Sequence, residues 1–125
     1  MFETKDSGKR KVFASGMQRD VTEGKTDYTY CLQGPMLKRW AELMERGAKK
    51  YDRDNWMKAS GPEELERFRA SALRHLIQWL HGETDEDHAA AVIFNLNGAE
   101  YVLGKMESAR EALETYDGLG FMGAR

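Results

Sequence analysis

Residues 62–80 read PEELERFRASALRHLIQWL and carry the clearest helical pattern of the chain. Its apolar side chains recur every three or four residues, the period of an α-helix with one buried face. Pro62 suits the first helical position, and Gly82 suits the residue after the helix end. We therefore expect a helix whose buried face consists of Leu65, Phe68, Ala72, Leu73, Leu76, Trp79 and Leu80.

Helical patterns also lie on both sides of this stretch. Gly34-Pro35 is a start signal for a first helix, whose apolar stripe comprises Leu37, Trp40, Ala41, Met44, Ala48 and Tyr51. Residues 52–61 break the period and predict a loop. Residues 84–87 (TDED) match a capping box, so a third helix is expected to start there. Its apolar residues are Val92, Leu96, Ala99 and Leu103.

The third helix is expected to run to about Met106 and to continue over residues 107–116, either straight or after a bend at Gly104. Gly118-Leu119-Gly120 would end it. The first 34 residues show no sustained period of 3.6 or 2. The predicted organisation is an N-terminal arm (1–34) packed on the body, a helical domain (35–117) and a C-terminal tail (118–125). The fold class is all-α, a small helical bundle preceded by an irregular N-terminal arm.

Composition excludes several classes of protein. The 125 residues suit one domain, with 41% hydrophobic and 32% charged residues. No apolar run approaches the ~20 residues of a membrane span, and no signal-peptide pattern is present. The lone Cys31 excludes an internal disulfide and a multi-cysteine zinc site. A net charge of −2 argues against nucleic acid polymers as partners. We expect a cytoplasmic protein that does not bind membranes.

Polar residues interrupt the apolar side of the third helix. At ~100° per residue, Asp85, His88 and Asn95 fall on the same side as Val92 and Ala99. Burying a polar side chain without a partner costs on the order of 1–3 kcal/mol, so His88 and Asn95 should be buried and hydrogen-bonded. The partner is either another helix or a ligand or metal between helices, and the pattern leaves both open.

Other polar residues are candidates for a binding site. Glu42 and Glu45 are three residues apart, so they lie side by side on a helix, where they can share Mg²⁺ or simply face water. His75 lies at the edge of its helix stripe, beside Arg74. The segment that ends the first helix combines cations, an amide and aromatic rings, which suit either helix capping and packing or a nucleotide: Lys49, Lys50, Tyr51, Asn55 and Trp56. No Walker, Rossmann or HExxH motif is present.

Several of these segments, in this order, resemble one family of short proteins common in phages, the dATP/dGTP diphosphohydrolase N-terminal type. That family is related to the MazG-like all-α nucleotide pyrophosphohydrolases. The resemblance covers about residues 16–97. It rests on Gly16, Arg19-Asp20, Glu23-Gly24-Lys25, Leu37 to Glu45, Gly47-Ala48-Lys49-Lys50-Tyr51, Asn55-Trp56, Ala72-Leu73-Arg74-His75-Leu76, Asp85-Glu86-Asp87-His88 and Asn95.

The resemblance implies hydrolysis of purine deoxynucleoside triphosphates to a monophosphate and pyrophosphate, with Mg²⁺ or Mn²⁺ as cofactor. The MazG-like pattern is ExxE on one helix and ExxD on a later one. Glu42 and Glu45 match the first half, whereas the third helix offers His88-x-x-Ala91. Either Asp85-x-x-His88 serves the metal in a modified site, or metal-dependent catalysis is weakened or lost. The alternative function is a non-catalytic phage protein that sequesters a nucleotide or a host nucleotide signal.

The resemblance also assigns roles to residues. The catalytic residues would be Glu42, Glu45 and His88, and the metal ligands Glu42, Glu45, Asp85 and His88. The substrate-binding residues would be Arg19, Lys25, Lys49, Lys50, Tyr51, Asn55, Trp56, Arg74, His75 and Asn95. The implied partners are a nucleotide and further copies of the chain in a homodimer or homotetramer. The location would be the cytoplasm, that of the host if a phage encodes the protein. A helical assembly module with neither activity is a third possibility.

Overall fold

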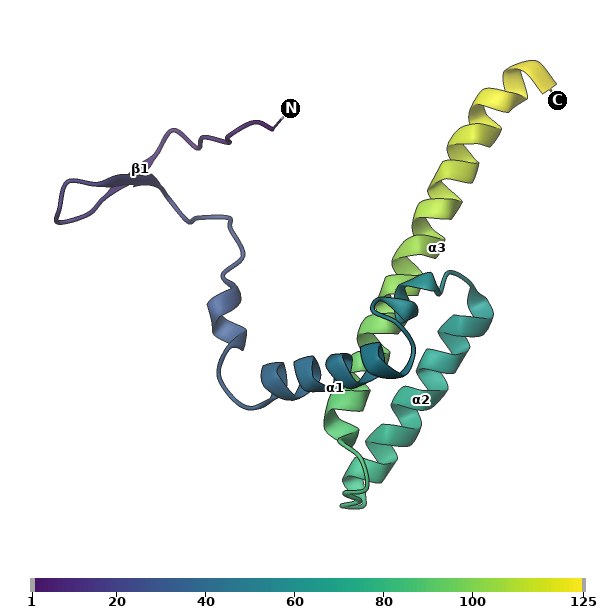
Figure 1. Cartoon of the computed structure of the whole chain (residues 1–125). Coiled ribbons are helices and arrows are strands. Elements are labelled where there is room, and N and C mark those ends of the chain that lie inside the picture. Colours follow the sequence, from purple (N-terminus) through teal and green to yellow (C-terminus); the bar gives the residue numbers. More distant parts are fainter. Residues whose placement is uncertain (1, 125) are drawn as a thin grey trace. The chain divides into compact units, whose positions relative to one another are not determined.

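The computed structural model describes residues 2–124, with side chains described for residues 2–115. The chain divides into two compact units, residues 1–33 and residues 34–125. The second unit carries the helices α1 (Met36–Lys50), α2 (Pro62–Leu80) and α3 (His88–Ala124), with a short 3-10 helix, η2 (Asn55–Lys58), between α1 and α2 (Figure 1). The prediction of an all-α bundle with an N-terminal arm is confirmed.

The N-terminal unit contains a short hairpin that the sequence analysis did not predict. Strand β1 (Arg10–Val12) pairs antiparallel with β2 (Gln18–Asp20), and a one-turn 3-10 helix, η1 (Tyr28–Cys31), follows. The turn between the strands places Gly16 at a φ of +91°, which favours glycine. None of residues 2–33 is buried, so polar contacts such as the bidentate pair of Arg10 and Asp6 (2.8 and 2.9 Å) hold this unit.

Helices α2 and α3 form an antiparallel hairpin, joined by residues 81–87, and pack along each other (Figure 1). A small apolar core lies at their contact, formed by Leu65, Ala99 and Val102 together with Ala59, which follows η2, and flanked by Phe68 and Met106. Gly98 allows the close approach, because a Cβ there would lie 2.6 Å from Phe68 Cζ. Helix α1 also contacts α3, and Arg39 joins it to Asp87 through two hydrogen bonds (2.5 and 2.8 Å).

The helix ends follow capping rules, with some differences from the predictions. Glu64 accepts hydrogen bonds from the backbone N–H groups of Ser60 (2.9 Å) and Gly61 (3.2 Å), and Pro62 is the first residue of α2 as predicted. Helix α3 starts at His88 and not in residues 84–87, because Asp87 caps it by accepting from Ala90 N–H (3.1 Å).

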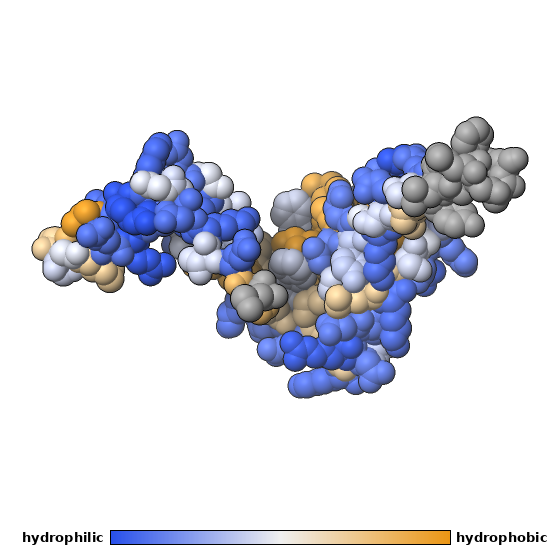
Figure 2. All heavy atoms as spheres, turned by 90° about the horizontal axis from the view of Figure 1, so that it is seen from above, coloured by the Kyte–Doolittle hydropathy of each residue, from blue (hydrophilic) through white to orange (hydrophobic). Residues whose placement is uncertain are grey.

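Two other predictions about α3 and α2 are wrong. Helix α3 continues through residues 118–120 to Ala124, so Gly118 and Gly120 do not end it as predicted. On α2, only the residues that face α3 are covered. Four residues predicted as buried are exposed instead: Leu73 (59%), Leu76 (41%), Trp79 (54%) and Leu80 (66%). Figure 2 shows apolar side chains at the surface of the helical unit.

Candidate functional site

A groove of about 1390 Å³ lies in the helical unit, between α1, the segment after it, α2 and the start of α3. It brings together residues that are far apart in the sequence, and ten of them were predicted as site residues. These ten are Glu42, Glu45, Lys50, Tyr51, Asn55, Trp56, Arg74, His75, Asp85 and Asn95. The loop after α1 reaches this groove through a sharp turn at Asp54, whose φ of 65° is left-handed. Such a conformation is uncommon for a residue other than glycine.

Helix α1 supplies the carboxylates of the groove. Glu42 and Glu45 lie one turn apart and both line it, with Glu42 partly buried and Glu45 exposed. Their oxygen donors suit Mg²⁺, which usually takes one or two protein carboxylates together with phosphate oxygens and water. The residues present therefore fit a magnesium ion that arrives with a nucleoside triphosphate.

Cations and aromatic rings line other parts of the groove. Lys50, at the end of α1, lies over the Tyr51 ring, with Nζ 5.0 Å from its centroid. Arg74 is an exposed residue of α2. The Trp56 ring packs edge-to-face on Tyr101, with centroids 5.0 Å apart, so it has a structural partner as well as a groove position. The groove thus offers positive charge and rings, which are what phosphate groups and a base require.

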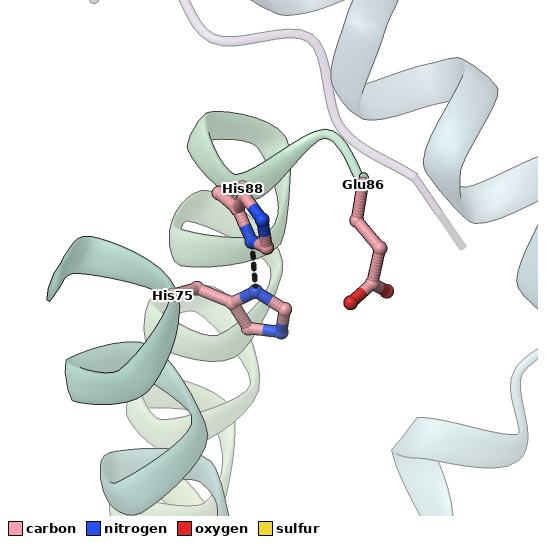
Figure 3. A group of neighbouring side chains, drawn as sticks. All are labelled: His75, Glu86 and His88. Atoms are coloured by element: carbon pink, nitrogen blue, oxygen red, sulfur yellow. Dashed lines mark hydrogen bonds between the residues drawn. The ribbon is translucent and has the colours of Figure 1, made fainter. Parts of the chain in front are cut away.

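The end of the α2–α3 hairpin beside the groove is polar. His75 of α2 and His88 of α3 are 7% and 2% exposed, and their Nδ1 atoms are 2.9 Å apart (Figure 3). His88 Nε2 lies 2.7 Å from Asp85 Oδ1. Since a carboxylate only accepts, the Nε2 proton of His88 is donated to Asp85. In the neutral pair, His75 Nδ1–H then donates to His88 Nδ1.

Two pKa shifts accompany this arrangement. Burial lowers the pKa of His75, and the positive charge of Arg74 lowers it further, so the neutral imidazole is favoured. The hydrogen bond from His88 lowers the pKa of Asp85. The two pKa shifts favour a neutral His75 and an ionised Asp85. His88 lies between them and is hydrogen-bonded to both.

Asn95 is buried, at 6% exposure, and its Nδ2 donates to Ala91 O (2.8 Å) within α3. The prediction that His88 and Asn95 are buried and hydrogen-bonded is therefore confirmed. His75, predicted only at the edge of its stripe, is buried as well. The groups that contact His88 are His75 of α2 and the Asp85 carboxylate.

Some predicted residues lie outside the groove lining. Lys49 is an exposed residue of α1 and does not line the groove, while His88 sits behind His75. Arg19 lies in β2 and Lys25 in a turn, where its N–H donates to Thr22 O (2.9 Å), so both belong to the N-terminal unit. Their part in binding stays a prediction.

Several groove residues were not predicted from the sequence. The ion pair of Arg39 and Asp87 joins residues 48 positions apart, and no local pattern signals such a contact. Glu86 was considered only as part of a helix start, yet it lies beside His75 and His88 (Figure 3). Its position two residues before a histidine that the helical spacing predicts to be buried was the available signal. Further groove residues not predicted are Arg46, Asp52, Arg53 and Asp54.

The family model described as dATP/dGTP diphosphohydrolase, N-terminal, matches residues 15–110, more than three quarters of the chain. The chain belongs to this family. The family name denotes a hydrolase of dATP and dGTP, and the matched residues span the whole groove. No curated protein and no solved structure matches the chain. No helix in the described residues is long and apolar enough to cross a membrane.

Proposed function

We propose that the protein hydrolyses purine deoxynucleoside triphosphates to a monophosphate and pyrophosphate in the groove of the helical unit. The observation that carries the proposal is the gathering of carboxylates, cations and aromatic rings from three helices around one groove, in a chain of the diphosphohydrolase family. The groove volume of about 1390 Å³ is ample for a nucleotide, since small-molecule pockets measure roughly 300–1,000 Å³.

In this reaction water attacks the α-phosphorus, the bond from that phosphorus to the bridging oxygen breaks, and pyrophosphate leaves. Mg²⁺ or Mn²⁺, when bound, neutralises phosphate charge and lowers the pKa of a coordinated water. Glu42 and Glu45 would hold the metal, and Lys50 and Arg74 the phosphates. His88 has both ring nitrogens engaged and is 2% exposed, so it would act through His75.

The base and the far phosphates would contact the remaining site residues. We assign the base to Tyr51 and Trp56, with hydrogen bonds from Asn55 and Asn95. Lys49 adds positive charge next to Lys50. Arg19 and Lys25 are also proposed as nucleotide-binding residues, so Arg19→Ala/Lys25→Ala should weaken nucleotide affinity without changing helicity. Unchanged affinity would remove these two residues from the site.

The test of the proposal is incubation with a panel of nucleotides and Mg²⁺ or Mn²⁺, followed by separation of products and bound species. We expect dATP and dGTP to give monophosphate plus pyrophosphate only with a divalent metal. Glu45→Gln should abolish turnover. Glu66→Gln, an exposed glutamate of α2 outside the groove lining, is the matched control and should keep it.

A second function, sequestration of a nucleotide without turnover, is favoured by one observation. Where the MazG-like pattern has ExxD, this chain has His88-x-x-Ala91, and the Asp85 carboxylate one turn earlier accepts a hydrogen bond from His88 Nε2 (2.7 Å). In the nucleotide panel, a protein of this kind would bind a nucleotide tightly and return it intact. That outcome would replace hydrolysis by sequestration of a nucleotide or a host nucleotide signal.

We also propose that the protein is a cytoplasmic homodimer or homotetramer encoded by a phage. Support for assembly comes from the face of α2 formed by Leu73, Leu76, Ile77 and Leu80, each of which is at least 41% exposed. Contiguous apolar surface of this kind marks interaction sites in soluble proteins. Analytical ultracentrifugation over a range of protein concentrations tests this part of the proposal.

A further inference from the structure

Three ligand-type side chains meet at the polar end of the α2–α3 hairpin. His75, Glu86 and His88 each offer a donor atom, and these atoms lie within 4.8 Å of one another (Figure 3). They come from α2, from the connecting segment and from the first residue of α3. The two histidines are buried, whereas Glu86 is exposed. Within the part of the chain that the structure describes, this is the group that combines three such donors.

We propose that His75, Glu86 and His88 bind one divalent late first-row transition-metal ion, with Zn²⁺ as the best fit. The two Nδ1 atoms are 2.9 Å apart. Two nitrogen ligands at 2.0–2.1 Å from a tetrahedral ion lie roughly 3.3 Å from each other. If the two Nδ1 atoms move apart by a few tenths of an ångström, both can therefore bind one ion. Glu86, on a segment outside the helices, supplies the third.

The contact of His88 with Asp85 is an independent observation that points to a metal. A metal-bound histidine commonly donates its other ring N–H to a carboxylate, which fixes the tautomer and the ring orientation. His88 Nε2, 2.7 Å from Asp85 Oδ1, has this arrangement. The lone pair of its Nδ1 then points toward His75. Asp85 is thus a positioning residue for His88 and not itself a ligand.

Besides these small shifts of the donor atoms, binding requires a change of tautomer at His75. Without the ion, His75 Nδ1–H donates to His88 Nδ1. With the ion, both Nδ1 lone pairs are coordinated and the proton of His75 moves to its Nε2, so both rings stay neutral. Neutral imidazole is the form that ligates metals.

The donor set selects the class of metal. Imidazole nitrogen suits Zn²⁺, Cu²⁺, Ni²⁺ and Fe²⁺, whereas Mg²⁺ prefers oxygen ligands and an octahedral site. The site therefore differs in chemistry from the Glu42 and Glu45 pair on α1. Three protein ligands leave one coordination position of a tetrahedral ion open. Since His75 and Glu86 line the groove, that position is accessible to water or an anion from the groove. This inference does not depend on the proposed hydrolysis.

The test uses the full-length chain, stripped with a chelator and titrated with Co²⁺ alone, whose visible absorption reports four-coordinate nitrogen and oxygen ligation. We expect one equivalent per chain, displaced by Zn²⁺ and not by a hundredfold excess of Mg²⁺. His75→Ala and His88→Ala should each weaken binding at least 100-fold. Glu86→Gln and Asp85→Asn should weaken it about 10- to 100-fold.

Two variants keep the test decisive. Glu86 is exposed, so Glu86→Gln should fold normally, as circular dichroism can check, and should still lose affinity. His81, the third histidine, follows α2 and is exposed, and His81→Ala should bind Co²⁺ like the wild type. Absence of stoichiometric Co²⁺ binding by the wild type, full affinity in folded Glu86→Gln, or an equal loss in His81→Ala would each overturn the proposal.

Discussion

Helix α2 has two apolar faces, of which one is buried against α3 and the other is exposed to solvent. One face carries Leu65 and Phe68 toward α3, where Leu65 is only 5% exposed. The adjacent face, about 100° around the helix, carries Leu73, Leu76, Ile77 and Leu80, which are 41–66% exposed. Both faces carry large apolar side chains. This difference in exposure shows that apolar spacing identifies a helix. The position of the neighbouring helix then determines which of the apolar residues form the core.

The largest expected effect is at the covered face. Leu65→Ala removes a buried side chain from a small core, and such a change costs about 2–5 kcal/mol in free energy of unfolding. Urea unfolding, followed by circular dichroism, measures this. The loss should be the same at all protein concentrations, because the side chain contacts its own chain. A loss under 1 kcal/mol would show that the two faces of α2 do not differ as described.

A smaller effect is expected where α2 and α3 approach most closely. Gly98→Ala places a Cβ 2.6 Å from Phe68 Cζ, and overpacking typically costs about 1–3 kcal/mol. The higher helix propensity of alanine offsets up to about 1 kcal/mol of this. Combining Gly98→Ala with Phe68→Leu should restore part of the loss, since the ring is what the Cβ meets. Chemical unfolding of both variants gives the coupling, and strict additivity of the two losses would contradict a direct contact.

The helical fold could be predicted from the sequence, because helix formation depends on local signals. Pro62 marks the start of a helix, and the apolar period of residues 62–80 marks its extent. The burial of His88 and Asn95 was predictable from helical spacing for the same reason. The exposed face of α2 was not, since Leu73 and Leu76 satisfy the same period as Leu65. The approach of His75 to His88 and of Arg39 to Asp87 depends on how helices cross, which periodicity does not contain. Many groove residues could therefore be predicted from the sequence. Their distances and contacts with one another are known only from the structure.

Removing the ion pair between Arg39 and Asp87 should change the free energy of unfolding less than Leu65→Ala or Gly98→Ala does. The Arg39 guanidinium lowers the pKa of Asp87 from 3.8 to about 2, aided by the Ala90 N–H. A carboxylate whose pKa is depressed by folding stabilises the protein above its ordinary pKa, and this contribution is lost as pH falls from about 4 to about 2. Asp87→Asn keeps the helix cap but loses the charge, so it should cost on the order of 1 kcal/mol at pH 7.

The measurement is urea unfolding of wild type and Asp87→Asn at pH 7 and near pH 2. The difference between the two proteins should shrink markedly at the lower pH, because near pH 2 the Asp87 carboxyl is about half protonated in the folded wild type and almost fully protonated in the unfolded chain. A difference of equal size at both pH values would show that the charge is not what Asp87 contributes. Glu66→Gln, in an exposed contact with Arg69 (3.9 Å), serves as the matched control and should change stability little at either pH.

The smallest effect on the fold is expected at the exposed face of α2. Leu76→Asp/Leu80→Asp should change the free energy of unfolding of a separated protomer by less than about 1 kcal/mol, as is usual for surface positions. If this face joins copies of the chain, the same variant should be monomeric and its melting temperature should no longer rise with protein concentration. Sedimentation of the variant beside the wild type decides this, and an unchanged oligomer would place the interface elsewhere.

Helix α3 extends well past the hairpin as a single uninterrupted element of 37 residues. From His88 to Thr115 it spans roughly 40 Å at 1.5 Å per residue, and a tilt of about 5° at the histidine end would displace Thr115 by roughly 3–4 Å. The helix is therefore a lever that enlarges small rearrangements around His88. A pair of spectroscopic labels, one near Arg74 and one at Thr115, would read such a rearrangement at a distance, far from the groups that cause it.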